Sequence, residues 1–94
     1  MKGYVIAEIE MTDAAAFQAY RSRVEATIAD HGGRYLVRGG TAEAMEGAAP
    51  KRMVVLEFPS LAESKTWYHS PAYQEIIGLR HAASKGRLML VEGI

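Results

Sequence analysis

The sequence contains no cysteine, only three prolines and no excess of charge of either sign. The absence of cysteine excludes disulfide bonds, cysteine-ligated iron–sulfur clusters and thiol catalysis. Eleven basic residues balance eleven acidic ones and are interspersed with them. Because nucleic acids and anionic membrane surfaces are recognised through a concentrated positive field, we expect neither as a partner.

The sequence also lacks a long hydrophobic run. No stretch approaches the length needed to cross a membrane, and the amino-terminal segment meets Glu8 too early to supply the apolar region of a secretory signal. We therefore expect a cytoplasmic protein. Its 94 residues predict a single domain spanning residues 1–94, near the small end of the size range, which would gain stability from a partner subunit.

Alternating and helical patterns of apolar residues predict the order β-α-β-β-α-β. The first helix can be capped by Thr12 or Asp13 and ended by the glycines at 32 and 33. Near the carboxyl terminus, Gly86 is expected to end the last helix. The strands are expected at 4–10, 34–38, 53–58 and 88–92, with a hairpin arm at 41–46, and the first helix at 13–31.

The second helix is expected in two pieces. Ser60 and Glu63 form a capping-box pair that starts the first piece. Ser70 is a suitable cap for the second piece, and Pro71 fits its first turn, where the missing amide hydrogen costs nothing. The commonest way to bury such a pattern is the ferredoxin-like α+β sandwich, with a four-stranded antiparallel sheet.

The strands predict a second apolar face. Three of them carry two apolar residues followed by a glutamate at alternate positions: Tyr4-Ile6-Glu8, Met53-Val55-Glu57 and Leu88-Leu90-Glu92. Helices cover one face of such a sheet, so the other would expose more apolar surface than a monomer usually tolerates. We therefore expect a homodimer that packs through its sheet faces. If the first and third strands are adjacent and parallel, Glu8 and Glu57 lie near each other.

Several motifs together resemble the bacterial family of domains of unknown function that is numbered thirteen-thirty. They are Lys2-Gly3-Tyr4, the run from Gly32 to Gly40, Glu46-Gly47, Glu57-Phe58-Pro59-Ser60, the run from Trp67 to Tyr73, Arg80, and Val91-Glu92-Gly93. That family is similar to the dimeric α+β barrel superfamily, which includes cofactor-free monooxygenases, haem-degrading enzymes and muconolactone isomerases. The resemblance implies a dimeric ferredoxin-like fold with a cleft between sheet and helices, and no particular reaction.

The matched positions include the candidate site residues. The candidates for ligand binding are Tyr4, Arg38, Trp67, Tyr68, Tyr73 and Arg80, and those for catalysis are Glu57 and His69. The aromatic residues would grip a planar apolar ligand, although aromatics at helical spacing more often fill a core. His69 would act as a general base if a carboxylate oriented it, although a surface histidine without a function fits the sequence better.

Arg80 falls on the apolar stripe of its helix, so it must pair with a carboxylate or reach solvent along its stem. Glu57 and Glu8 are the possible partners, and a structural salt bridge competes with binding of an anion. Arg38 likewise either anchors the carboxylate of a ligand or supplies a charge at the rim of the dimer.

Three hypotheses for function follow: a small enzyme that uses no bound cofactor, a binder of a small hydrophobic or anionic metabolite, and a structural or interaction module whose charges stabilise the dimer. Three scattered histidines lack the spacing of a zinc motif, so we expect no metal site.

Overall fold

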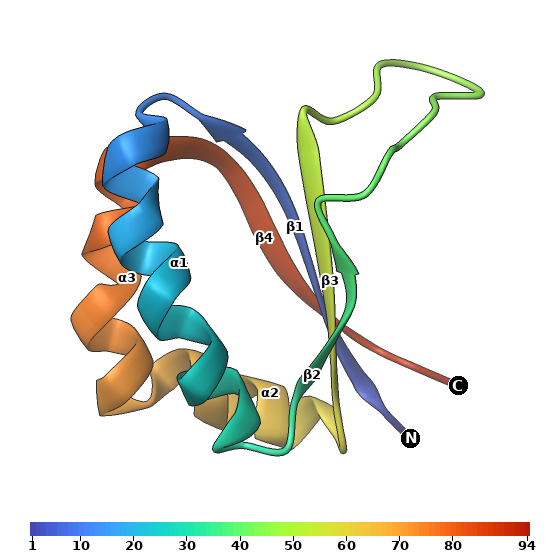
Figure 1. The fold of residues 1–94 in the computed structure, drawn as a ribbon. Coiled ribbons are helices and arrows are strands. Elements are labelled where there is room, and N and C mark those ends of the chain that lie inside the picture. The colour runs from blue at the N-terminus through green and yellow to red at the C-terminus, as the bar shows by residue number, and fades with distance from the viewer.

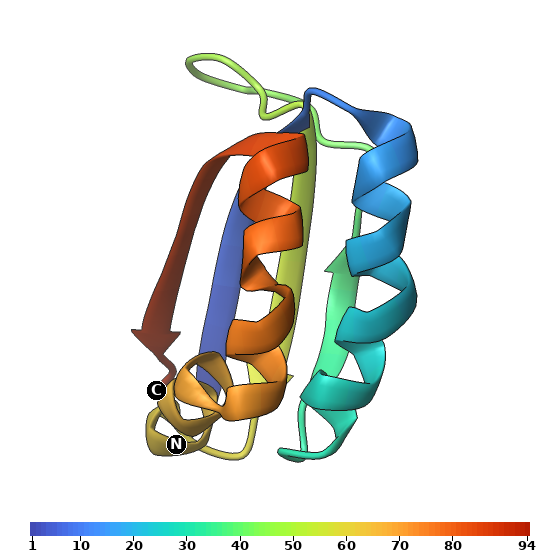
Figure 2. The same ribbon diagram turned by 90° about the vertical axis from the view of Figure 1, so that its left-hand side faces the viewer.

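The computed structural model describes residues 1–94, which form a layer of helices on one face of an antiparallel sheet (Figure 1). In chain order the elements are β1 Gly3–Met11, α1 Ala14–Ala29, β2 Arg34–Arg38, β3 Arg52–Phe58, α2 Leu61–His69, α3 Pro71–Ala83 and β4 Ser84–Glu92. α1 and α3 run side by side over the sheet, and α2 lies at one end (Figure 2). None of the helices is both long and apolar enough to cross a membrane.

The sheet order is β2-β3-β1-β4, and every neighbouring pair is antiparallel. This confirms the ferredoxin-like fold but shows that the expected parallel pairing of the first and third strands is wrong. The helical crossover leaves β2 parallel to β1, and the connection to β3 reverses the chain. Glu57 therefore lies opposite Tyr4 and Glu8 opposite Met53, so the two glutamates are at different ends of the sheet.

The core lies between the helices and one face of the sheet. Val5, Ala7 and Ile9 point from β1 toward the helices and are all buried. They meet the stripe of α1 that runs through Phe17, Tyr20, Val24 and Ile28. Complete burial of one large apolar side chain contributes about 1.5–3 kcal/mol, so this stripe determines where α1 packs.

Side-chain caps define the helix starts. Asp13 accepts a hydrogen bond from the amide of Ala16, and Ser60 accepts one from the amide of Glu63, as the sequence predicts. Ser70 accepts from the amide of Tyr73 and donates to the carbonyl of Trp67, so one hydroxyl joins the end of α2 to the start of α3. The predicted break in the second helix is therefore confirmed.

The last strand differs from the prediction. α3 ends at Ala83 rather than at Gly86, and β4 begins directly at Ser84. Leu88 and Leu90 pair with Ala7 and Val5 and hence face the helices, not the open side as expected. Apolar residues occupy both faces of β4, so their alternation in the sequence could not show which face meets the helices. The pairing of β4 with β1 shows it.

The open face of the sheet carries an apolar row that crosses all four strands. Met89 pairs with Ile6, Ile6 with Val55, and Val55 with Val37. An ion pair lies on each side of the row: Arg34–Glu57 at 2.9 Å and Arg87–Glu8 at 2.8 Å.

The segment that joins β2 to β3 projects beyond the sheet (Figure 1). It contains no strand, so the expected arm at 41–46 is wrong. Its side chains are almost all exposed, and Met45 retains 82% of its accessible surface. Without apolar burial, nothing fixes a pairing register for a short arm.

Candidate functional site

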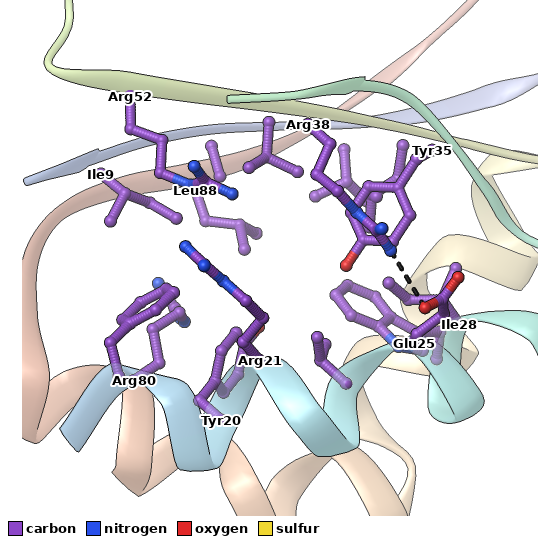
Figure 3. A pocket seen from close by; sticks show the side chains of 17 residues that line it. Ile9, Tyr20, Arg21, Glu25, Ile28, Tyr35, Arg38, Arg52, Arg80 and Leu88 are labelled. Carbon is purple, nitrogen blue, oxygen red and sulfur yellow. Dashed lines mark ion pairs between the residues drawn. The ribbon is translucent and has the colours of Figure 1, made fainter. Parts of the chain in front are cut away.

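A cleft of about 420 Å³ lies between the sheet and the helices. Its walls come from the helix-facing side of the sheet, from α1, and from single residues of α2 and α3 (Figure 3). Twelve of its seventeen lining residues are hydrophobic: Val5, Ala7, Ile9, Phe17, Tyr20, Val24, Ile28, Tyr35, Val54, Leu56, Trp67 and Leu88. The other five are charged, and they are described in turn below.

Four arginines line the cleft against a single carboxylate. They are Arg21, Arg38, Arg52 and Arg80, and the carboxylate belongs to Glu25. Four positive charges and one negative charge leave a formal excess of three positive charges in an otherwise apolar space. Such an excess repels cations and attracts anions, and low-dielectric walls strengthen both effects.

Arg38 and Glu25 lie on the side where α1 approaches β2. Their charged groups are 3.1 Å apart, and the Arg38 guanidinium lies 3.9 Å from the centre of the Tyr35 ring. The bond to Glu25, aided by Tyr35, raises the pKa of Arg38. A second hollow adjoins the cleft here and shares these three residues, and we refer to this solvent-exposed edge as the entrance. Both charged side chains are largely exposed, so the pair adds little stability.

Arg80 is buried and Arg52 is half-buried, and both are incompletely paired. The Nε atoms of both are buried and have no hydrogen-bond partner, and they are the only buried side-chain polar atoms in the protein with this property. Arg80 retains only 8% of its accessible surface. A buried donor without a partner costs about 1–3 kcal/mol, and more when it is charged. Each of these two atoms therefore marks a position in the cleft where an acceptor is missing.

Arg21 extends from α1 toward Arg52, which extends from β3 (Figure 3). The guanidinium of Arg21 lies 5.8 Å from the centre of the Phe17 ring, one helical turn earlier. Burial, and then the positive charges of Arg21 and Arg38, lower the pKa of Arg52. An anion between these cations would relieve their repulsion.

Gly39 makes room for Arg52. Its φ of 71° lies in the left-handed region, and a Cβ there would overlap the Arg52 guanidinium. Its amide also donates to the carbonyl of Met53, which fixes the end of β2 against β3. The glycine therefore holds a turn that a larger residue resists and leaves space for the cation.

Two tyrosines share a hydrogen bond at the helix side of the cleft. The hydroxyl oxygens of Tyr20 and Tyr73 are 2.9 Å apart, and Tyr20 lines the cleft whereas Tyr73 is completely buried. Burial raises the pKa of both phenols. Both therefore stay protonated at neutral pH, and the nearby positive charge of Arg80 opposes the shift without reversing it.

The aromatic side chains in the run from Trp67 to Tyr73 belong mostly to the hydrophobic core. Trp67 lines the cleft, donates from its indole to the hydroxyl of Thr27 at 3.0 Å and packs 4.2 Å from the Tyr73 ring centre. Tyr73 supports this wall from behind, and Tyr68 packs at its edge without lining the cleft.

Glu57 and Tyr4 lie on the open face of the sheet, away from the cleft. The Tyr4 hydroxyl donates to Glu57 at 3.2 Å, and the Arg34 Nε donates to it at 2.9 Å. The Arg34 bond lowers the pKa of Glu57, although desolvation opposes the shift. The sheet separates both Glu57 and Glu8 from the helices, and they pair with Arg34 and Arg87, so neither of these possible partners pairs with Arg80.

His69 is exposed at the end of α2, and its ring packs against Tyr68 rather than into the cleft. Of the sequence candidates, the cleft thus brings together Arg38, Trp67 and Arg80. Sequence reasoning missed Arg21, Arg52 and Tyr20. One signal was available: Arg52 alternates in phase with Val54 and Leu56, which places it on the helix-facing side.

The strand order and the layer of helices on one face define an α+β protein of the ferredoxin-like class. Residues 2–94 match the family model described as "Domain of unknown function (DUF1330)", and the chain belongs to that family.

Similar solved structures share this fold at low sequence identity. The chain is similar to RPA0582 of Rhodopseudomonas palustris, a protein of unknown function, with a TM-score of 0.81, 19% identity, and coverage of 99% of this chain and 82% of the other. It is similar to SnoaB of Streptomyces nogalater, described as a cofactor-independent oxygenase, with a TM-score of 0.67, 14% identity, and coverage of 99% and 93%. HapK of Hahella chejuensis gives a TM-score of 0.61, 17% identity, and coverage of 98% and 92%. No curated protein matches the sequence.

Proposed function

We propose that the protein binds a small organic anion with an apolar body in the cleft between the sheet and the helices. The observation that carries this proposal is the pair of buried Nε atoms, on Arg52 and Arg80, that have no partner within the protein. Arginine binds planar anions through paired donors, so a carboxylate is a suitable acceptor.

A structural role explains these two arginines less well. A buried arginine that serves stability is expected to meet a carboxylate, because an unpaired buried charge is costly. The carboxylate of the cleft, that of Glu25, is engaged by Arg38 on the entrance side. The protein thus retains inner cations without a carboxylate partner, as a binding site for an anion would.

The volume and the walls agree with a metabolite-sized ligand. A volume of about 420 Å³ lies within the usual range for small-molecule sites, about 300–1,000 Å³. Aromatic and aliphatic side chains, including Trp67 and Phe17, would cover the apolar body of the ligand while the arginines hold its charge.

We further propose that the protein is a homodimer through the open face of the sheet. The apolar row Met89–Ile6–Val55–Val37 lies there without a cover, and a second copy of the same sheet, packed face to face about a twofold axis, would cover it. The two flanking ion pairs would lie at the rim of the interface and favour one register. In this arrangement the ion pairs at the rim of the dimer interface and the charged residues of the cleft lie on opposite faces of the sheet.

Thermal-shift measurements with a panel of aryl and alkyl carboxylates, sulfonates and phosphates test the binding proposal. A ligand at about a hundred times its Kd stabilises a protein by about 2.7 kcal/mol, which raises Tm measurably. We expect a carboxylate to raise the Tm of the wild-type protein and not that of Arg80→Met.

The matched control is Arg23→Met, which removes an exposed arginine of α1 outside the cleft. Its response to the ligand should equal that of the wild type. An unchanged response in Arg80→Met, or no response to any anion, contradicts the proposal. Mass spectrometry of the recovered ligand distinguishes a binder, which returns it unchanged, from an enzyme.

A further inference from the structure

The hydrogen bond between Tyr20 and Tyr73 leaves one hydroxyl hydrogen unused. Each phenol carries one hydrogen, and a single bond of 2.9 Å joins the two oxygens. One hydroxyl donates in that bond, and the other must direct its hydrogen elsewhere. The Arg80 guanidinium also donates toward the Tyr73 oxygen and opposes the rise in the pKa of that phenol, whereas neither hydroxyl has an acceptor within the protein other than its partner.

The surroundings of the two tyrosines indicate which hydroxyl hydrogen does not take part in the bond between them. Tyr73 has no exposed surface and lies beside Arg80, whose positive charge acts on its hydroxyl. A free hydrogen on Tyr73 would be buried without an acceptor and close to a cation, at a cost of about 1–3 kcal/mol. Either oxygen could be the donor in this bond, and the cost of burying a free hydrogen favours Tyr73 as the donor, which leaves the remaining hydrogen to Tyr20.

Tyr20 can direct that hydrogen into the cleft. Its side chain lines the cleft with Arg80 and Arg52, and its helix faces the sheet across the hollow (Figure 3). Because burial raises its pKa, the phenol remains a neutral donor throughout the physiological range. The wall of the cleft thus offers a neutral donor in addition to its cations.

We propose that the ligand is an oxo carboxylate, whose carboxylate meets Arg52 and Arg80 and whose neighbouring carbonyl or enol oxygen accepts the hydrogen bond of Tyr20. This inference rests on the proposed binding of an organic anion and adds a specificity-determining residue to it. A simple carboxylate would leave the Tyr20 hydrogen without an acceptor, whereas an oxygen close to the carboxylate receives it.

Titration calorimetry with pairs of acids that differ by one carbonyl oxygen tests this inference. The pairs are phenylpyruvate with 3-phenylpropanoate, and 4-methyl-2-oxopentanoate with 4-methylpentanoate. For the wild-type protein we expect the oxo acid of a pair to bind about 3- to 10-fold more tightly, as a neutral hydrogen bond provides. Tyr20→Phe should abolish this preference while it still binds the simple acid.

Tyr73→Phe is the matched control. It removes the same tyrosine–tyrosine hydrogen bond, so its stability should fall as that of Tyr20→Phe does, but it leaves the Tyr20 hydroxyl in place. We expect it to keep the preference for the oxo acid. Equal affinities for both acids in the wild type, or a preference that survives in Tyr20→Phe, overturn the inference and leave the proposed function standing. If no organic anion of the thermal-shift panel binds, the proposed function fails as well.

Discussion

At the scale of single residues, the arginines of the cleft differ in how completely the protein pairs them. Arg38 has a carboxylate and an aromatic ring as partners, whereas Arg52 and Arg80 keep an unpaired Nε. The difference separates a surface interaction, which adds little stability, from buried donors without a partner, which lower the stability of the empty protein. Binding sites often carry such a cost, because groups arranged for a ligand are not satisfied without it.

Arg80→Met should not destabilise the protein in the absence of ligand. Methionine fills a similar apolar space and removes a buried charge without a carboxylate partner, so the free energy of unfolding should stay unchanged or rise, by up to about 4 kcal/mol. Urea denaturation of both proteins measures this. A loss of several kcal/mol would show that Arg80 has a structural partner, and would contradict the account of the cleft.

Glu57→Gln should change how stability depends on pH. Hydrogen bonding to Arg34 lowers the pKa of Glu57 in the folded protein, so its contribution is fully present above the ordinary glutamate pKa of about 4.3 and is lost as the pH falls through the lowered value. Denaturation between neutral and acidic pH should show wild type and variant converging at low pH. Glu43→Gln, in the exposed connection after β2, should keep the wild-type profile.

The sequence predicted the roles of some residues correctly and not those of others. The caps at Ser60 and Ser70 were predictable because they depend on hydrogen bonds between residues three positions apart. The partners of Arg80 were not, because they depend on which face of the sheet carries each glutamate and on strand direction, and both are long-range properties.

At the scale of elements, the pairing of β4 with β1 depends on a glycine at position 86. Gly86 has a φ of 151°, and a Cβ there would overlap the carbonyl oxygen of Glu8 in the neighbouring strand. The glycine permits the strand to follow α3 directly, without a loop. Gly86 lies within the strand and does not end the helix, so the sequence prediction for this position was wrong.

Gly86→Ala should therefore destabilise the protein by more than about 1 kcal/mol, because the new methyl group is strained and separates two paired strands. Thermal denaturation measures the effect. Gly78→Ala is the control, since Gly78 is exposed in α3 and a Cβ there meets nothing within 4 Å. That variant should be more stable than wild type by about 0.5–1 kcal/mol. Equal effects at the two positions would contradict this account of β4.

The order of the elements followed from local patterns, but the composition of the cleft did not. Periodicity placed the apolar stripe of α1 correctly, since that stripe depends only on helical geometry. The cleft lies between α1 and the sheet. The arginines that line it come from α1, β2, β3 and α3. No sequence spacing relates such distant positions.

At the scale of the whole molecule, the sheet separates two surfaces with different properties. The helices cover one face of the sheet and leave the other open (Figure 1). The covered face, together with the helices, encloses the charged cleft, and the open face carries the apolar row flanked by ion pairs. A partner on the open face would leave the entrance between α1 and β2 free. Dimerisation and ligand binding can therefore be tested separately.

Sedimentation analysis should show a dimer for the wild-type protein and a monomer for Ile6→Lys. Ile6 lies in the apolar row, where a lysine charge would be buried by a partner but tolerated in a folded monomer. Met45→Lys, in the exposed connection between β2 and β3, should remain a dimer. A monomeric wild type, or a dimer that persists in Ile6→Lys, would contradict pairing through this face.

The central claim is that the cleft holds an organic anion on Arg52 and Arg80. A crystal structure of the protein grown with a bound carboxylate from the thermal-shift panel tests it most directly. The account predicts density in the cleft with carboxylate oxygens about 2.7–2.9 Å from the Nε of Arg52 or Arg80. Density elsewhere on the molecule, or both Nε atoms hydrogen-bonded to groups of the protein itself, would contradict it.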